Sequence, residues 1–398
     1  MGKLRELEII FDGEANLFSQ NDIIKGEVVL TVDNDKGYGL KDVKGVWVRF
    51  RGKAKTKWTT TTRHQQKTRH HTHSLKENYF DTYVVLFGTA RYDHDERGLH
   101  IPPGRNNIPF QFQLPATPLP SPFEGKYGYV RYQAKATVSL IRTFSNKDYK
   151  SERFFSLIGP SLDLNQHPET LEEVHRSQEV TDCCGCTCTP EMLITAGLRK
   201  TGYVPGEGIF ATGQVDNREG NETVAFELTL LQVIEFRSRG NTKSKTYSLS
   251  HFESDVSCPK GQVTNFTVGP LLVPPVPASG LLGCSIIGIE YYVEVETEGF
   301  SATFEVIIGT VPHQIVSGPS TAATAPPIGF EGIELSGFTN APSASPPEAP
   351  PPPSYEEVVG VVDRLAPERD PEEYFGNKQF VPRYPYFNLQ ADGAPVHQ

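Results

Sequence analysis

Several patterns common in enzymes are missing from this 398-residue sequence. The phosphate-binding pattern Gly-x-x-x-x-Gly-Lys-Ser/Thr, the zinc pattern His-Glu-x-x-His and the nucleophile pattern Gly-x-Ser-x-Gly do not occur. A partial match to a dinucleotide-binding pattern at Gly206, Gly208 and Ala211 opens a predicted strand with no helix after it, which is typical of a turn. We therefore expect no catalytic residues, no cofactor and no metal.

Segments that would enter a membrane are also missing. No long apolar region follows Met1, so we expect no secretory signal, and Glu6 stands where a myristoylation site needs Ser or Thr. The uncharged span 261–289 is long enough to cross a bilayer, but its prolines at 270, 274, 275 and 277 exclude a regular helix. These absences predict a soluble, cytosolic protein.

Acidic residues are missing from one long stretch, although the whole chain carries a net charge of -10. Residues 1–165 hold 25 Lys and Arg against 18 Asp and Glu, whereas the remainder holds 13 against 30. Between Trp47 and Lys76 there is no acid, while nine Lys and Arg occur from Arg49 to Lys76. An anionic partner would therefore meet the N-terminal part of the chain.

A sustained helical period is absent from the first 165 residues, which alternate short β-type runs with Gly, Pro and Asn. We expect strands at 23–32, 46–57, 108–114 and 127–140. Period-2 alternation puts Val46, Val48 and Phe50 on a core face. The opposite face then carries a row of positive charge, formed by Arg49, Arg51, Lys53, Lys55 and Lys57.

This basic row has three interpretations: a merely solvated strand face, a site for acidic or phosphorylated receptor tails, and a site for anionic lipid. Its length inside an acidic protein favours binding as strongly as solvation. Nucleic acid is not expected, because Trp47 and Trp58 are the only aromatics on that face. The histidines at 64, 70, 71 and 73 fit an exposed hairpin tip and have no acidic or cysteine ligand nearby, so they do not predict a metal site.

A second all-β region follows residue 190 and repeats features of the first. The Ile24-Lys-Gly-Glu27 sequence is echoed by Val204-Pro-Gly-Glu207, and a proline stands 17 residues before both Tyr132 and Tyr291. The two regions therefore resemble one sandwich used twice. In the strand at 289–297, Ile289, Tyr291, Val293 and Val295 face inward and the exposed face is acidic, with Glu290, Glu294, Glu296 and Glu298.

Four of the six cysteines lie between the two β-regions, in a polar segment that we expect to be a linker. They are Cys183, Cys184, Cys186 and Cys188, and they could bind a soft metal, accept palmitate or pair as a disulfide. Adjacent Cys183 and Cys184 do not easily share one tetrahedral zinc, and no Cys-x-x-Cys partner occurs elsewhere. We favour a linker signature of unknown purpose as the first interpretation, and lipidation as the second.

Aliphatic periodicity fades after residue 316, and 15 of the 32 prolines fall in the last 82 residues. We expect a disordered tail. It contains Pro350-Pro-Pro-Pro-Ser-Tyr355, whose polyproline helix puts Pro352 and Tyr355 on one face that suits the aromatic groove of a WW domain. A weaker copy is Val381-Pro-Arg-Tyr384, which lacks the first proline. The alternative is an inert spacer, but two copies favour docking.

Taken in order, these motifs resemble the arrestin domain-containing proteins, or α-arrestins. The resemblance rests on Gly202-Tyr-Val-Pro-Gly-Glu207, Leu282-Gly-Cys-Ser-Ile-Ile287 and Ile308-Gly-Thr-Val-Pro312, together with the cysteines and the tail. It implies an all-β fold of two immunoglobulin-like sandwiches at 1–165 and 191–316, a linker at 166–190 and a tail at 317–398. The WW-docking role carries over to Pro352, Pro353 and Tyr355, and less firmly to Pro382 and Tyr384.

The resemblance also implies a non-catalytic adaptor in the cytoplasm that is recruited to the plasma membrane and endosomes. Such an adaptor links membrane receptors or transporters to HECT-type ubiquitin ligases with WW domains. Two alternatives stay open: a thioredoxin-binding regulator that uses Cys258, and a retromer-like sorting subunit. The chain lacks an obvious clathrin box, and no buried charged switch for phosphate-triggered activation is found.

Overall fold

Alternating apolar and polar residues give the central strands one buried face each. In strand β9 (Gly128–Leu140), Val130, Tyr132, Ala134, Ala136 and Val138 are fully buried, as predicted. In β18 (Ile287–Thr297), the predicted inward residues Ile289, Tyr291, Val293 and Val295 are likewise buried. This alternation supplies the two hydrophobic cores.

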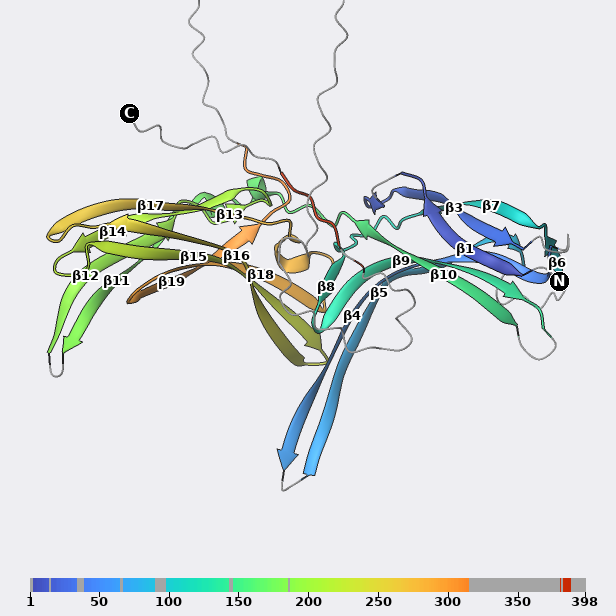
Figure 1. Ribbon diagram of the computed structural model, residues 1–398, viewed down its shortest axis with the longest axis horizontal. Coiled ribbons are helices and arrows are strands. Elements are labelled where there is room, and N and C mark those ends of the chain that lie inside the picture. Colours follow the sequence, from blue (N-terminus) through green and yellow to red (C-terminus); the bar gives the residue numbers. More distant parts are fainter. Residues whose placement is uncertain are drawn as a thin grey trace, which may run out of the picture.

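The fold is described from a computed structural model of the chain (Figure 1). It describes residues 3–13, 16–33, 39–64, 67–89, 98–142, 146–184, 187–314, 380 and 382–387. Within these residues the regular structure is β-strand apart from three short 3-10 helices, so the predicted all-β class is confirmed.

The first domain packs a three-stranded sheet against a larger one. The small sheet has the order β1-β3-β7, and the larger sheet has the order β2-β10-β9-β4-β5, with β6 paired to β4 and β8 paired to β9. The strands of the domain are β1 (Leu4–Phe11), β2 (Leu17–Phe18), β3 (Ile23–Val32), β4 (Leu40–His64), β5 (Lys67–Gly88), β6 (Leu99–Ile101), β7 (Gly104–Gln113), β8 (Phe123–Gly125), β9 and β10 (Lys147–Leu157).

The second domain repeats this arrangement with sheets β11-β12-β14-β17 and β13-β19-β18-β15-β16. Its strands are β11 (Val174–Cys184), β12 (Thr187–Leu198), β13 (Gly202–Tyr203), β14 (Gly208–Asn217), β15 (Thr223–Ser238), β16 (Asn241–Ser257), β17 (Gln262–Leu272), β18 and β19 (Phe300–Ile308). The helices η1 (Leu164–Gln166) and η2 (Pro168–Leu171) precede the domain, and η3 (Ser279–Leu281) lies before β18.

The predicted linker at 166–190 is wrong over its second half. Residues from Val174 onward form the hairpin β11-β12, which belongs to the second domain's sheet. β11 reads as a polar connection because it is an edge strand whose residues are mostly exposed. The connection between the domains is therefore the stretch 158–173. Within it, Asp163 forms an isolated β-bridge with Val311, which follows β19.

The predicted internal repeat is right in one half and misaligned in the other. The turn equivalent to Val204–Glu207 is Ser19–Asp22, not Ile24–Glu27, because both turns follow a short parallel strand and are closed by an acidic side chain. Asp22 accepts a hydrogen bond from the Ser19 N–H at 2.6 Å, and Glu207 accepts one from the Val204 N–H at 3.1 Å. The Tyr132 and Tyr291 equivalence holds, since each hydroxyl donates to a proline carbonyl at 2.7 Å.

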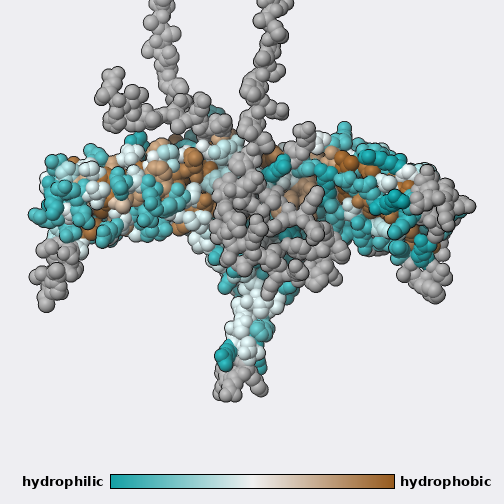
Figure 2. All heavy atoms as spheres, in the orientation of Figure 1, coloured by the Kyte–Doolittle hydropathy of each residue, from teal (hydrophilic) through white to brown (hydrophobic). Residues whose placement is uncertain are grey.

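A long hairpin, β4-β5, projects from the first domain away from both sheets (Figure 1). Its outer part is pale to teal in the space-filling view (Figure 2), and the described residues 61–63 and 68–72 are exposed, in agreement with the predicted polar hairpin. The base of the hairpin contacts the second domain. There the Glu77 carboxylate accepts hydrogen bonds from the Ser285 N–H at 3.0 Å and the Ser285 hydroxyl at 3.1 Å, while Thr56 Oγ1 donates to Arg237 O at 2.8 Å.

Candidate functional sites

The predicted basic row lies on the outer face of the first domain's larger sheet, where three of its members line a groove. Strand β9 pairs with β4, placing Lys135 opposite Arg49 and Arg131 opposite Lys53. The groove has a volume of about 200 Å³ and is lined by Arg49, Arg51, Lys53, Tyr83, Arg131, Gln133, Lys135, Thr137, Asp148, Lys150 and Glu152. Lys55 and Lys57 lie outside this lining.

The row is not free of acids in space, which corrects the expectation drawn from the sequence. Asp81 of β5 lies beside it because β5 pairs with β4. Its carboxylate accepts bonds from Arg49 Nε at 2.6 Å and Arg49 Nη2 at 2.5 Å, and Arg51 Nε lies 3.8 Å from Asp81 Oδ2. The hydrogen bonds from Arg49 hold the pKa of the Asp81 carboxyl below its usual value, despite partial burial.

The five residues of the row also differ in exposure. Lys53 and Lys55 are buried, at 4% and 5% exposed, whereas Arg49, Arg51 and Lys57 are partly exposed. Neighbouring strands also bring aromatic rings that the single-strand pattern does not contain. The Arg49 guanidinium lies 5.2 Å from the Tyr83 ring centroid, and the Arg131 guanidinium lies 4.0 Å from that of Tyr129.

The groove nevertheless keeps an excess of cations. Six Lys and Arg line it against two acids, Asp148 and Glu152, of which Glu152 forms an ion pair with Lys135. Arg51 Nε is buried and makes no hydrogen bond among the described residues. A buried donor of this kind is costly unless an acceptor reaches it. The groove can therefore accept a compact anionic group.

The groove residues from β9 were not predicted as a site. Their signal was available, since Arg131, Gln133, Lys135 and Thr137 alternate with the inward residues of the predicted strand 127–140. Only the pairing of β9 with β4 makes the two basic sets adjacent.

The cysteines predicted as a lipidation site lie at the tip of the β11-β12 hairpin. Backbone pairing places Cys183 opposite Cys188 and Cys184 opposite Thr187, while Cys186 lies outside the described residues. The hairpin brings three of the four cysteines to one end of the second domain. Their palmitoylation stays a prediction.

Cys258 is fully buried, and its Sγ donates to the Val256 carbonyl at 3.6 Å. Burial raises the pKa of this thiol. Since a reactive cysteine needs an accessible thiolate, these properties do not favour the thioredoxin alternative. Cys284 is partly exposed and faces the domain junction, where its Sγ lies 3.9 Å from Glu77 Oε2, and burial raises its pKa as well.

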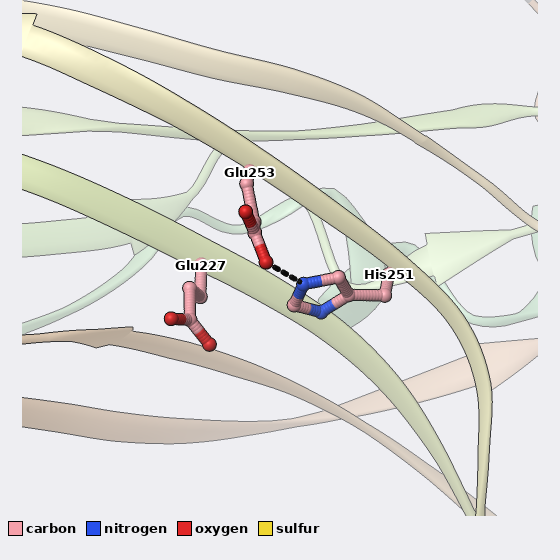
Figure 3. Close-up of side chains that lie close together, drawn as sticks. All are labelled: Glu227, His251 and Glu253. Carbon is pink, nitrogen blue, oxygen red and sulfur yellow. Dashed lines mark hydrogen bonds and ion pairs between the residues drawn. The ribbon is translucent and has the colours of Figure 1, made fainter.

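One cluster of metal-binding residue types occurs among the described residues, on the outer face of β15 and β16 (Figure 3). Glu227 pairs directly with Glu253 across the strands, and His251 lies one position further along that face. His251 Nε2 bonds Glu253 Oε1 at 2.8 Å, while His251 Nδ1 bonds Thr229 Oγ1 at 3.0 Å. All three side chains are exposed, so we interpret the cluster as polar residues of a solvated strand face.

The two tail motifs have different structural positions. Pro352, Pro353 and Tyr355 lie outside the described residues, so their WW-docking role stays a prediction. Pro382 and Tyr384 are described, and both are buried against the body of the protein. Tyr384 is 4% exposed, and its hydroxyl donates to the Pro122 carbonyl at 2.9 Å.

The fold and these surfaces define a two-domain β-sandwich protein with a basic groove on one domain and a tail segment docked at the junction. The arrestin (or S-antigen) N-terminal domain matches residues 7–165, and the arrestin C-terminal domain matches residues 191–319. The chain therefore belongs to the arrestin family, as one of its α-arrestins.

Similar proteins carry the same family description. Arrestin domain-containing protein 17 of Caenorhabditis elegans is 28% identical over 79% of this chain and 72% of its own length. Arrestin domain-containing protein 1 of Homo sapiens is 30% identical over 64% of this chain and 57% of its own length, so the match spans less than two thirds of that relative. Arrestin domain-containing protein 4 of Homo sapiens is 22% identical over 78% of this chain and 73% of its own length. In the described part of the chain, no helix is long and apolar enough to cross a membrane.

Proposed function

We propose that this α-arrestin is a non-catalytic adaptor that links membrane receptors or transporters to HECT-type ubiquitin ligases. The two sandwiches present the cargo-binding surfaces, and the tail recruits the ligase. Cargo is then ubiquitinated, internalised and sorted through endosomes. The protein works in the cytoplasm and reaches the plasma membrane and endosomes through its partners.

The observation that carries this proposal is Pro350-Pro-Pro-Pro-Ser-Tyr355 on an arrestin body. A polyproline segment is ordered before it binds, so it loses little conformational entropy in an aromatic groove. Pro352 and Pro353 supply the ring surfaces, and Tyr355 supplies the aromatic anchor. Neither the inert-spacer nor the retromer-like alternative gives this combination a use.

We assign the groove around Arg51 the anionic part of the cargo side. An acidic or phosphorylated receptor tail, or the headgroup of an anionic lipid, would supply an acceptor for the buried Arg51 Nε and would meet cations that also pair with acids of the sheet. The acidic outer face of the second domain, with Glu290 and Glu296 exposed, would repel the same groups. The charge difference between the domains thus sets which of them meets the cargo.

Proximity labelling in cells tests the ligase connection. The full chain fused to a labelling enzyme should mark WW-domain ubiquitin ligases together with membrane receptors or transporters. Tyr355→Ala should remove the ligases and keep the cargo, because the sandwiches are untouched. Ligase labelling that is unchanged in Tyr355→Ala would refute the proposed recruitment.

A further inference from the structure

Residues Phe380 and Pro382–Phe387, called here the docked segment, lie between the two domains (red in Figure 1). On the first domain, the Phe380 ring packs on Phe154 of β10 with centroids 5.2 Å apart, and the Tyr384 hydroxyl bonds Pro122 O. On the second domain, the Phe387 N–H donates to Pro205 O at 3.0 Å. The segment therefore touches both domains within eight sequence positions.

The side chains of the docked segment divide into an inward and an outward set. Pro382 and Tyr384 are buried, whereas Arg383 is exposed and Tyr386 is 38% exposed. A segment resting loosely on a surface would not bury one tyrosine to 4% with its hydroxyl bonded while leaving the other in solvent. This selective burial is typical of a peptide in a shaped site.

Gly206 shows that the second domain is shaped for the segment. Its φ is +95°, and a Cβ built there would overlap Phe387 O. The equivalent turn of the first domain has Asn21 at the matching position with φ 67°, so a turn of this kind accepts an asparagine side chain. It is therefore the close approach of Phe387, more than the backbone angle, that favours glycine at 206.

The acceptor for Phe387 belongs to a turn that is held by contacts outside the docked segment. Glu207 closes the turn by accepting from the Val204 N–H and pairs with Lys200. The Gly206 N–H donates to Val273 O at 2.8 Å, and the Val273 N–H donates to Glu207 O at 2.9 Å. Pro205 O is thus presented by a turn that is bonded on both sides.

We infer that the junction between the two domains is a peptide-binding site for an aromatic-proline sequence, and that its occupant is this chain's own segment 380–387. The site recognises Tyr384 through Pro122, and it recognises the passing backbone through Pro205 and Gly206. The occupied site holds the two domains together at this edge. It also stores the second tail motif in a buried form.

One consequence rests on the proposed WW docking. A WW domain must reach Pro382 and Tyr384, and both are buried in the occupied site. Binding of a WW domain to this motif and docking of the segment are therefore mutually exclusive. In a chain that carries Tyr355→Ala, the further change Gly206→Asn should release the segment. A single WW domain should then bind at least tenfold more tightly than it binds the Tyr355→Ala chain alone.

Hydrogen exchange of the full chain tests the site without any WW domain. The peptide containing Phe387 should be protected in the wild type and should exchange at least tenfold faster in Gly206→Asn, which keeps the turn geometry that Asn21 shows but blocks the segment. Gly261→Asn is the matched control, because Gly261 has φ +68° and nothing lies within 4 Å of the added Cβ. It should exchange like the wild type.

Variants in the tail show whether a loss of protection in Gly206→Asn comes from damage to the fold of the second domain. Tyr384→Ala changes only the segment and should also lose protection at Phe387, whereas Tyr386→Ala should not. Equal exchange in the wild type, Tyr384→Ala and Gly206→Asn would overturn the proposed site.

A binding measurement in trans completes the test. A labelled synthetic peptide of residues 378–390 should bind the full-length Tyr384→Ala chain at least tenfold more tightly than the wild type, whose site is filled intramolecularly. Adding Gly206→Asn to the Tyr384→Ala chain should abolish that binding. Equal binding to all three chains would also overturn the proposal. Neither the exchange experiment nor the peptide-binding experiment contains a ligase. A negative result in either would therefore reject the peptide-binding site without rejecting the proposed adaptor function.

Discussion

Asp81 is the acid that pairs with Arg49 beside the groove. The Arg49 guanidinium bonds both of its oxygens, and the pKa of the carboxyl is lowered as a result. A depressed folded-state pKa means that this pair contributes stability above the ordinary aspartate pKa of about 3.9, and that the contribution is lost as pH falls through the lower folded value.

We expect carbon NMR of the Asp81 carboxyl to titrate below ordinary aspartates. In Arg49→Gln, its pKa should move up toward the ordinary value, because the charge-assisted hydrogen bonds are gone. Asp163, whose pKa is lowered by hydrogen bonds from Asn165, serves as an internal reference that should not change. An Asp81 pKa that is the same in both proteins would contradict the assigned pairing.

Tyr132 and Tyr291 hold equivalent places in the two cores. Each is fully buried, and each hydroxyl bonds a proline carbonyl, Pro120 O or Pro277 O. The Tyr291 hydroxyl also accepts a hydrogen bond from buried Gln232 at 3.0 Å. Substitution by phenylalanine removes the hydroxyl and leaves its partners without it.

We expect Tyr132→Phe to lower the free energy of unfolding by about 1–3 kcal/mol and Tyr291→Phe to lower it by more, because a second hydrogen bond is lost. Chemical denaturation followed by fluorescence measures both. Tyr386→Phe, on an exposed ring, is the control and should change little. A smaller effect at Tyr291 than at Tyr132 would contradict this reading of the second core.

Single residues also show where the sequence is sufficient and where it is not. The burial of Val130, Tyr132 and Ile289 follows from period-2 alternation alone, because alternation decides which face of a strand meets a core. The pairing of Asp81 with Arg49 does not follow, since they are 32 positions apart and meet only through the register of β4 with β5. No acid occurs in the sequence between Trp47 and Lys76, but the pairing of β5 with β4 brings Asp81 beside Arg49.

Among the strands, four form the groove together: β4, β5, β9 and β10. The solvated-face interpretation and the binding interpretation differ in one respect, which is whether the cations act as a unit on an anionic surface. Arg51 on β4 and Lys150 on β10 lie on opposite sides of the groove lining and can be neutralised without removing the Arg49–Asp81 pair.

We expect Arg51→Gln together with Lys150→Gln to weaken association with vesicles containing anionic lipid, at about 1 kcal/mol per cation and so about thirtyfold in low salt. The effect should shrink as salt is added, because screening weakens both proteins' attraction. Lys243→Gln with Lys260→Gln makes the same charge change on the second domain and should have no such effect. Vesicle binding that both double variants weaken equally would assign the attraction to net charge and not to the groove.

The predicted boundary of the second domain differs from the observed one because of a single strand, β11. β11 has few buried residues, so its sequence resembles a linker, and its status as a strand depends on pairing with β12. The repeat was misaligned for a related reason: Gly-Glu recurs at 26–27 and 206–207, but the turns that match are defined by hydrogen bonds at Asp22 and Glu207. Local composition carries no information about either pairing.

The full chain joins an arrestin body to a tail with two motifs, of which only the second lies among the described residues. The weaker motif at Tyr384 is buried at the domain junction, and no sequence pattern indicates this, because its receptor comprises Pro122 and Pro205 from different domains. Under the proposed function, the stronger motif at Tyr355 is the one that recruits a ligase. We therefore expect ligase docking to depend on Tyr355.

Calorimetry of the full-length chain with a single isolated WW domain tests this most directly. We predict one WW domain bound per chain, loss of about 2 kcal/mol or more of binding free energy in Tyr355→Ala, and no measurable change in Tyr384→Ala. Binding that survives Tyr355→Ala at full strength, or that Tyr384→Ala weakens as much, would contradict the account.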